Sequence, residues 1–161
     1  MFSKLIAGCC LGGLLGILAA CDVENLGRLK PGVSTSADVR QVMGNPKLEW
    51  RDADGSRYWE YPRTPEGMVN YRMVIGPDDR LREIRQLLTA ENFAKVKPGM
   101  TREDVHFLLG QPAHQRYFSL KREAVWDWKT KTEPGMDWYF NVHFNDDGLV
   151  THTSTNFEPR G

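Results

Sequence analysis

Cys21 is the residue of this 161-residue chain whose surroundings point most directly to a chemical role. It follows Leu18, Ala19 and Ala20, and small residues at such a position let the backbone enter a protease cleft. A cysteine thiol is also a nucleophile soft enough to take up a lipid chain as a thioether. The alternative, a secretory peptide cut at an A-x-A site, is disfavoured because Leu18 is not small. Cys21 is therefore predicted to carry a lipid.

The segment 1–20 that precedes this cysteine has the layout of a signal peptide. Lys4 is its one charged residue, a largely aliphatic stretch follows, and small residues end it. The apolar run contains four glycines and is short for a permanent bilayer span of about 20 residues. Its end resembles the bacterial lipobox, after which cleavage makes the cysteine the lipid-bearing first residue. The segment 21–28 is then a lipidated tether, and several acyl chains hold it at about 0.8 kcal/mol per buried methylene.

The other candidate metal-binding and catalytic side chains do not have the spacing of a known metal site or catalytic motif. The four histidines, His106, His114, His143 and His152, match no compact zinc pattern, so we expect surface or half-buried side chains. Asp52-x-Asp54-Gly55 resembles the start of a calcium loop, but a hairpin turn is expected because no ligand follows at the spacing of an EF-hand. No G-x-S-x-G motif follows residue 20. The sequence predicts no catalytic residue, no metal and no cofactor, and so a protein that is not an enzyme.

The overall charge gives no reason to expect binding to nucleic acid. Removal of segment 1–20 takes away Lys4, Cys9 and Cys10. The remaining chain has 20 basic and 21 acidic side chains, a net charge of about −1. One cysteine then remains, which allows no internal disulfide. A chain of this length can bury roughly two thirds of its unfolded surface, enough for one domain or two small ones.

The chain repeats itself once. Leu29–Pro46 reads LKPGVSTSADVRQVMGNP, and Val96–Pro112 reads VKPGMTREDVHFLLGQP. Further on, WEY at 59–61 matches WDW at 126–128, and DDRL at 78–81 matches DDGL at 146–149. These three pairs of matching segments occur in the same order and predict a tandem duplication. The two copies are predicted to be small units, at 29–88 and 89–161.

Each copy is predicted to begin with helices and turns. Lys-Pro-Gly suits a type II turn, because its glycine tolerates a positive φ. Thr35 and Thr101 are predicted N-caps, each with an aspartate three residues later that completes a capping box. Gly44 and Gly110 are predicted to end these helices. A further short helix is expected at 89–96.

Alternating side chains predict strands after each helix. Trp138, Phe140, Val142 and Phe144 alternate with more polar residues, as in a strand with one buried face. Further strands are expected at 47–51, 56–62, 71–75, 114–120 and 124–130, and after residue 148. Segment 80–88 fits a helix or a strand, and its alignment with 148–155 favours a strand. The predicted fold class is α+β, with two tandem helix-turn-helix units that each carry an antiparallel sheet of three or four strands.

The aromatic residues of these strands allow two interpretations. The pairs Trp59 with Tyr61 and Trp126 with Trp128 either pack under the helices or line a binding surface. If they pack, Tyr58 and Tyr139 point the other way. An outer face that carries Tyr139, Asn141 and His143 is then a candidate protein-binding surface, because tyrosine is enriched in such contacts.

A basic segment is the candidate for contact with lipid. Arg80, Arg82 and Arg85 could meet anionic head groups of a membrane. The alternative is a solvated basic segment with no lipid partner.

The motif Lys97-Pro98-Gly99-Met100-Thr101-Arg102-Glu103-Asp104-Val105, with Leu108-Leu109-Gly110-Gln111-Pro112, resembles the signature of the SmpA/OmlA (BamE-like) family of lipoproteins. The resemblance covers the second copy well and the first more loosely, over most of 29–156. It implies a non-enzymatic lipoprotein that faces the periplasm and binds envelope proteins, in β-barrel assembly or outer-membrane integrity. The family implies the outer membrane, while Asp22 resembles a retention signal for the inner membrane.

The tandem layout also resembles that of the β-lactamase inhibitor proteins. In those proteins a broad sheet surface grips another protein. This resemblance implies an alternative function, that of a tethered inhibitor of an envelope enzyme.

Overall fold

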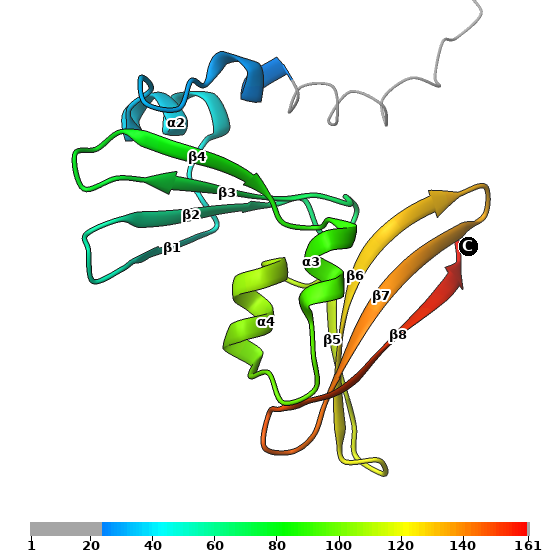
Figure 1. The fold of residues 1–161 in the computed structure, drawn as a ribbon. Helices are drawn as coiled ribbons and strands as arrows, with labels where there is room; N and C mark the ends of the chain where they lie inside the picture. Colours follow the sequence, from blue (N-terminus) through cyan, green and yellow to red (C-terminus); the bar gives the residue numbers. More distant parts are fainter. Residues whose placement is uncertain (1–23, 161) are drawn as a thin grey trace, which may run out of the picture.

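The computed structural model describes residues 24–160 of the chain (Figure 1). The predicted signal peptide at 1–20, the lipid site Cys21 and the neighbouring Asp22 lie outside these residues, and lipid attachment stays a prediction. Between residues 24 and 160, no helix is long and apolar enough to cross a membrane.

Two four-stranded antiparallel sheets form the structure, in the orders β1-β2-β3-β4 and β5-β6-β7-β8 (Figure 1). The first half of the chain contains α2 (Ser36–Met43), β1 (Leu48–Arg51), β2 (Arg57–Pro62), β3 (Asn70–Ile75) and β4 (Leu81–Gln86). The second contains α3 (Ala90–Lys95), α4 (Arg102–Leu109), β5 (His114–Phe118), β6 (Glu123–Glu133), β7 (Met136–Phe144) and β8 (Val150–Pro159). The α+β class is confirmed, and the ambiguous segment 80–88 forms strand β4.

The duplicated motif builds the same helix ends in both halves. The Thr35 hydroxyl accepts from the Asp38 backbone N–H at 3.3 Å, and the Asp38 carboxylate accepts from the Thr35 N–H at 2.7 Å. Thr101 and Asp104 repeat this arrangement at 3.1 and 2.9 Å. These hydrogen bonds hold the pKa of both aspartates below the ordinary value. Both predicted capping boxes are confirmed.

One face of each sheet packs against helices and forms a core. The first core joins Leu29, Val39, Trp59, Tyr61, Met73, Ile75 and Leu81, and the second joins Leu88, Val96, Val105, Leu109, Ala124, Trp128, Val142, Phe144 and Val150. Trp126 is half-buried and packs against the second cluster. The interpretation that these aromatic pairs pack under the helices is therefore confirmed.

A matching aromatic residue in each core bonds to the end of the helix above it. The Tyr61 hydroxyl donates to the Gly44 carbonyl at 3.1 Å, and the Trp128 indole N–H donates to the Gly110 carbonyl at 3.2 Å. Both glycines are the helix C-caps, with φ of 79° and 69°. A helix end leaves carbonyls without intrahelical donors, so each bond satisfies one of them. Burial raises the pKa of Tyr61 to about 12, which keeps its hydroxyl a donor.

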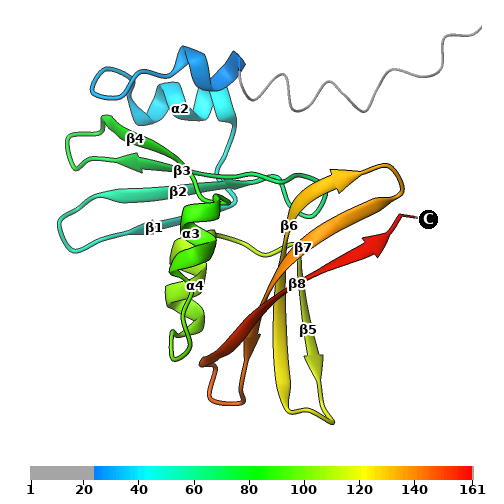
Figure 2. The same ribbon diagram turned by 45° about the vertical axis from the view of Figure 1, so that its right-hand side comes forward.

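The two halves meet through helix α4, which packs on the second sheet and also contacts the first (Figure 2). Arg72 on β3 is fully buried and donates to the Phe107 carbonyl of α4 at 2.7 Å. Its Nε and Nη2 atoms also donate to Oε1 of the buried Glu60, at 3.2 and 2.5 Å. The side chain of Asn70 donates to the carbonyls of Leu109 and Gln111, at 2.8 and 2.9 Å. Polar groups of the first sheet thus bind the C-terminal end of α4, where a positive charge is favourable.

Candidate functional site

The face of the second sheet that points away from its core carries mostly polar side chains, and we call it the polar face. Cross-strand register places His114, Asp127, Asn141 and Ser154 side by side. The same face also carries Arg116, Glu123, Val125, Lys129, Tyr139, His143, His152 and Asn156. The opposite face supplies the core residues Trp128, Val142 and Phe144.

The β7–β8 hairpin sets the register of this face. The Gly148 N–H donates to the Asn145 carbonyl at 2.9 Å, and Gly148 has a φ of 77°. The Asn145 side chain accepts from the Leu149 N–H at 2.9 Å. This turn places His143 directly opposite His152. Because side chains alternate along a strand, the same register puts Asn141 and Tyr139 on that face as well.

The central polar side chains are ordered and largely hidden from solvent. Asn141 donates to Asn156 Oδ1 at 2.9 Å and to Ser154 Oγ at 3.2 Å, and it is only 7% exposed. Tyr139 is also 7% exposed, with its ring 5.8 Å from that of His114. A buried polar group that is hydrogen-bonded keeps one orientation. The centre of the polar face is therefore a rigid surface.

Asp127 is the buried carboxylate of this surface and is 2% exposed. Nδ1 of His114 lies 3.0 Å from Oδ1 of Asp127, and Nη2 of Arg116 lies 3.6 Å from Oδ2. Burial raises the pKa of Asp127 above its ordinary value of 3.8, although His114 and Arg116 oppose this shift. Burial thus makes the ionised form of Asp127 less favourable in the folded protein than in the unfolded chain.

We expect the Asp127→Asn variant to be at least as stable as the parent protein at pH 7. When folding raises the pKa of a carboxyl, its protonated form favours the folded state. This stabilisation is complete at a pH below the pKa of the unfolded chain, and it is lost as the pH rises through the pKa of the folded protein. The advantage of the asparagine should therefore shrink as pH falls from 7 toward 3.8. Urea unfolding between pH 7 and pH 4 measures this change.

A suitable control is Asp147→Asn, because Asp147 is exposed in the β7–β8 turn and its loss removes the same charge. A difference between Asp127→Asn and the parent that stays constant over this pH range would contradict the expected role of burial.

The structure brings three of the four predicted partner-binding residues together. Tyr139, Asn141 and His143 lie on the polar face. Tyr58 lies on the first sheet, where its ring stacks on Trp50 at 5.5 Å and meets Phe107 edge-on at 6.4 Å. Tyr58 is thus at the junction with α4, away from the other three.

The arginines predicted to meet lipid have partners within the protein: Arg80 directly precedes β4, and Arg82 and Arg85 lie in it. Arg80 donates to the Val33 carbonyl at 2.8 Å. Arg82 pairs with Asp78 at 2.7 Å, and Arg85 pairs with Glu83 at 2.7 Å. Two of the three positive charges thus face a carboxylate of the same chain.

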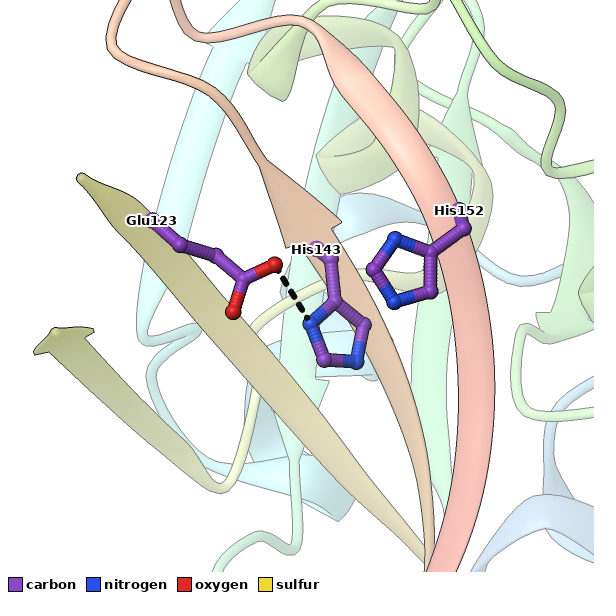
Figure 3. Close-up of side chains that lie close together, drawn as sticks. All are labelled: Glu123, His143 and His152. Carbon is purple, nitrogen blue, oxygen red and sulfur yellow. Dashed lines mark ion pairs between the residues drawn. The ribbon is translucent and has the colours of Figure 1, made fainter. Parts of the chain in front are cut away.

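Two groups of residues were not anticipated from the sequence. One is the buried pair Glu60 and Arg72 at the junction. The other is a cluster of Glu123, His143 and His152, whose ligand atoms all lie within 4.8 Å of one another (Figure 3). The turn signal at 145–148 could have revealed the second group, because it fixes which histidines pair across the hairpin.

A comparison with protein families gave a match in the second half of the chain. Residues 86–154 match the model of the outer membrane protein assembly factor BamE domain. This stretch is thus similar to a BamE domain. The match covers helices α3 and α4, strands β5 to β7 and the first part of β8. The resemblance of the second motif to the BamE-like family is thus confirmed.

A comparison with solved structures gave matches of low similarity. A DUF4309 family protein (YjgB) of Bacillus subtilis is 18% identical, with a TM-score of 0.32 over 87% of this chain and 93% of that one. A "putative beta-lactamase inhibitor protein" of Streptococcus mutans is 16% identical, with a TM-score of 0.33 over 85% and 96%. A comparison with curated proteins gave no match.

Proposed function

We propose that this chain is an envelope lipoprotein, tethered through Cys21, whose BamE domain binds other envelope proteins during β-barrel assembly in the outer membrane or in maintaining envelope integrity. The observation that carries this proposal is the match of residues 86–154 to the BamE domain. In this role the protein acts as a scaffold and not as an enzyme.

The geometry of the polar face supports a binding role. Its central groups, Asn141 and Tyr139, are already held in place by neighbouring strands. Around them Arg116, His152 and Asn156 are exposed and offer charged and polar contacts. A surface that is ordered before binding loses little conformational entropy when a partner docks.

The proposed location is the outer membrane, with the folded residues in the periplasm. The family name supports that membrane, and a lipid on Cys21 would supply the attachment. The inner membrane is the alternative, because Asp22 resembles a retention signal.

Photo-crosslinking in cells tests the proposal at single-residue resolution. A photoreactive amino acid at position 156 lies on the polar face, and one at position 155 lies on the opposite face of the same strand. Both positions are exposed, so they form a matched pair. We expect adducts with barrel-assembly proteins from position 156 and few from position 155. A Cys21→Ala form should lose these adducts because it is not tethered.

The outcome also separates the two candidate functions. A single envelope enzyme captured at position 156, with no barrel-assembly protein, would overturn the scaffold proposal and favour a tethered inhibitor. Equal adducts from positions 155 and 156 would show that the polar face does not select the partner.

A further inference from the structure

Two histidines and a glutamate meet at one end of the polar face. His143 on β7 lies opposite His152 on β8, and their rings stack with centroids 4.0 Å apart and planes 15° apart. Oε1 of Glu123, at the start of β6, lies 3.1 Å from Nδ1 of His143 (Figure 3). Three neighbouring strands thus each contribute one group that can bind a metal ion.

A hydroxyl group contacts one ring nitrogen of each histidine and so fixes the orientation of the ring. Oγ of Ser154 lies 2.9 Å from Nε2 of His143, and Oγ1 of Thr151 lies 3.0 Å from Nδ1 of His152. The other ring nitrogens, Nδ1 of His143 and Nε2 of His152, do not contact these hydroxyl groups. Metal-binding histidines characteristically use one ring nitrogen for the metal and the other for such a hydrogen bond.

Nδ1 of His143 faces the Glu123 carboxylate. In the tautomer of His143 whose Nε2–H donates to Ser154, the lone pair of Nδ1 points toward the Glu123 carboxylate and is repelled by it. Within residues 24–160, Nδ1 of His143 is buried and has no hydrogen-bond partner. A cation between the two groups would remove the repulsion.

The other two histidines do not form such a group. His106 lies 3.5 Å from Oε2 of Glu60, and His114 lies 3.0 Å from Asp127. In the described part of the chain, the set Glu123, His143 and His152 is the one group of three potential ligands.

We propose that Glu123, His143 and His152 bind a zinc ion on the polar face. Two imidazoles and a carboxylate are a ligand set that Zn²⁺ accepts, with a fourth position left for water. At Zn–N distances of about 2.0–2.1 Å, the donors must approach one another to roughly 3.3 Å. His152 is exposed and can turn to close this gap. Because the polar face is the proposed docking surface, the open position would face a bound partner, whose own side chain could replace the water.

Metal titration of the full-length protein in detergent, without an affinity tag and after treatment with a chelator, tests the site. We expect calorimetry to show one Zn²⁺ bound per chain, and Co²⁺ to give the visible absorption of a tetrahedral site. The variants His152→Gln and Glu123→Gln should each weaken Zn²⁺ binding by more than about 100-fold, since removal of a ligand exceeds the 10–100-fold effect of an outer-shell partner. Zn²⁺ should raise the melting temperature of the parent protein and of neither variant.

The matched control is His114→Gln, which removes a histidine from the same face but outside the cluster. It should bind Zn²⁺ as the parent protein does. The proposal is overturned if the parent protein binds no Zn²⁺ at millimolar concentration, or if His152→Gln and Glu123→Gln bind it as tightly as the parent. Circular dichroism without metal establishes that both variants fold. These measurements use no protein partner, so their outcome is independent of the crosslinking experiment.

Discussion

The Arg72→Ala variant is expected to lose about 3–5 kcal/mol of unfolding free energy, the range for removing one partner of a buried ion pair. The guanidinium is fully buried, and Glu60 beside it is 1% exposed. Without Arg72, the Glu60 carboxylate would stay buried without its guanidinium partner, and the Phe107 carbonyl would lose the donor that Arg72 supplies. Each of these losses destabilises the folded state, because a buried polar group without a partner has lost its hydrogen bonds to water and gains none in the protein.

Urea unfolding of Arg72→Ala, followed by tryptophan fluorescence, measures the effect. Since Arg72 joins the first sheet to α4, we also expect the single transition of the parent protein to separate into two. The double variant Glu60→Met with Arg72→Met should be more stable than Arg72→Ala, because it leaves no unpaired charge.

The control for this prediction is Arg82→Ala. Arg82 is an exposed arginine that pairs with Asp78, and its loss should cost no more than about 1 kcal/mol. A cost below 1 kcal/mol for Arg72→Ala would contradict the structural role given to the junction.

Local signals in the sequence were sufficient to predict the elements of the fold. A capping box depends on residues three apart, and a strand with one buried face depends on alternation, so both can be identified without tertiary information. Thr101 with Asp104 is an example in which the structure agrees, and the run from Trp138 to Phe144 does form a strand, although both of its faces contain buried side chains. The duplication also resolved segment 80–88, because one copy could be aligned on the other.

The junction could not be predicted because its contacts join distant parts of the chain. Arg72 alternates with the core residues Tyr71 and Met73, and this pattern is typical of an exposed charge on a sheet. Its partner carbonyls on α4 lie 34 and 35 residues later in the chain. Alternation assigns Arg72 to a face, but it does not show that a helix from the other half covers that face.

The polar face illustrates the same limit. Alternation correctly grouped Tyr139, Asn141 and His143, but it gave no sign that Tyr139 and Asn141 would be nearly buried. Their burial depends on Asn156 and His114, which come from other strands. The pairing of His143 with His152 required the register of the β7–β8 hairpin, which residue spacing alone did not supply.

The second large effect is expected for Trp128→Ala, which should cost about 3–5 kcal/mol of unfolding free energy. Trp128 is fully buried in the second core, so its removal leaves a cavity among Val105, Leu109 and Phe144. The variant also leaves the Gly110 carbonyl, at the end of α4, without the indole donor. Chemical unfolding followed by circular dichroism measures the loss.

Two further variants distinguish the cost of the cavity from the cost of the lost hydrogen bond. Tyr61→Phe removes only the hydroxyl that bonds to Gly44 in the first copy, so it should cost about 1 kcal/mol, the usual net value of one hydrogen bond. Trp126→Ala truncates a tryptophan that is only half-buried and should cost less than Trp128→Ala. If Trp126→Ala were as costly as Trp128→Ala, packing under α4 would not be the main contribution of Trp128. If Tyr61→Phe had no effect, the bond that both copies make to the helix end would stabilise neither of them.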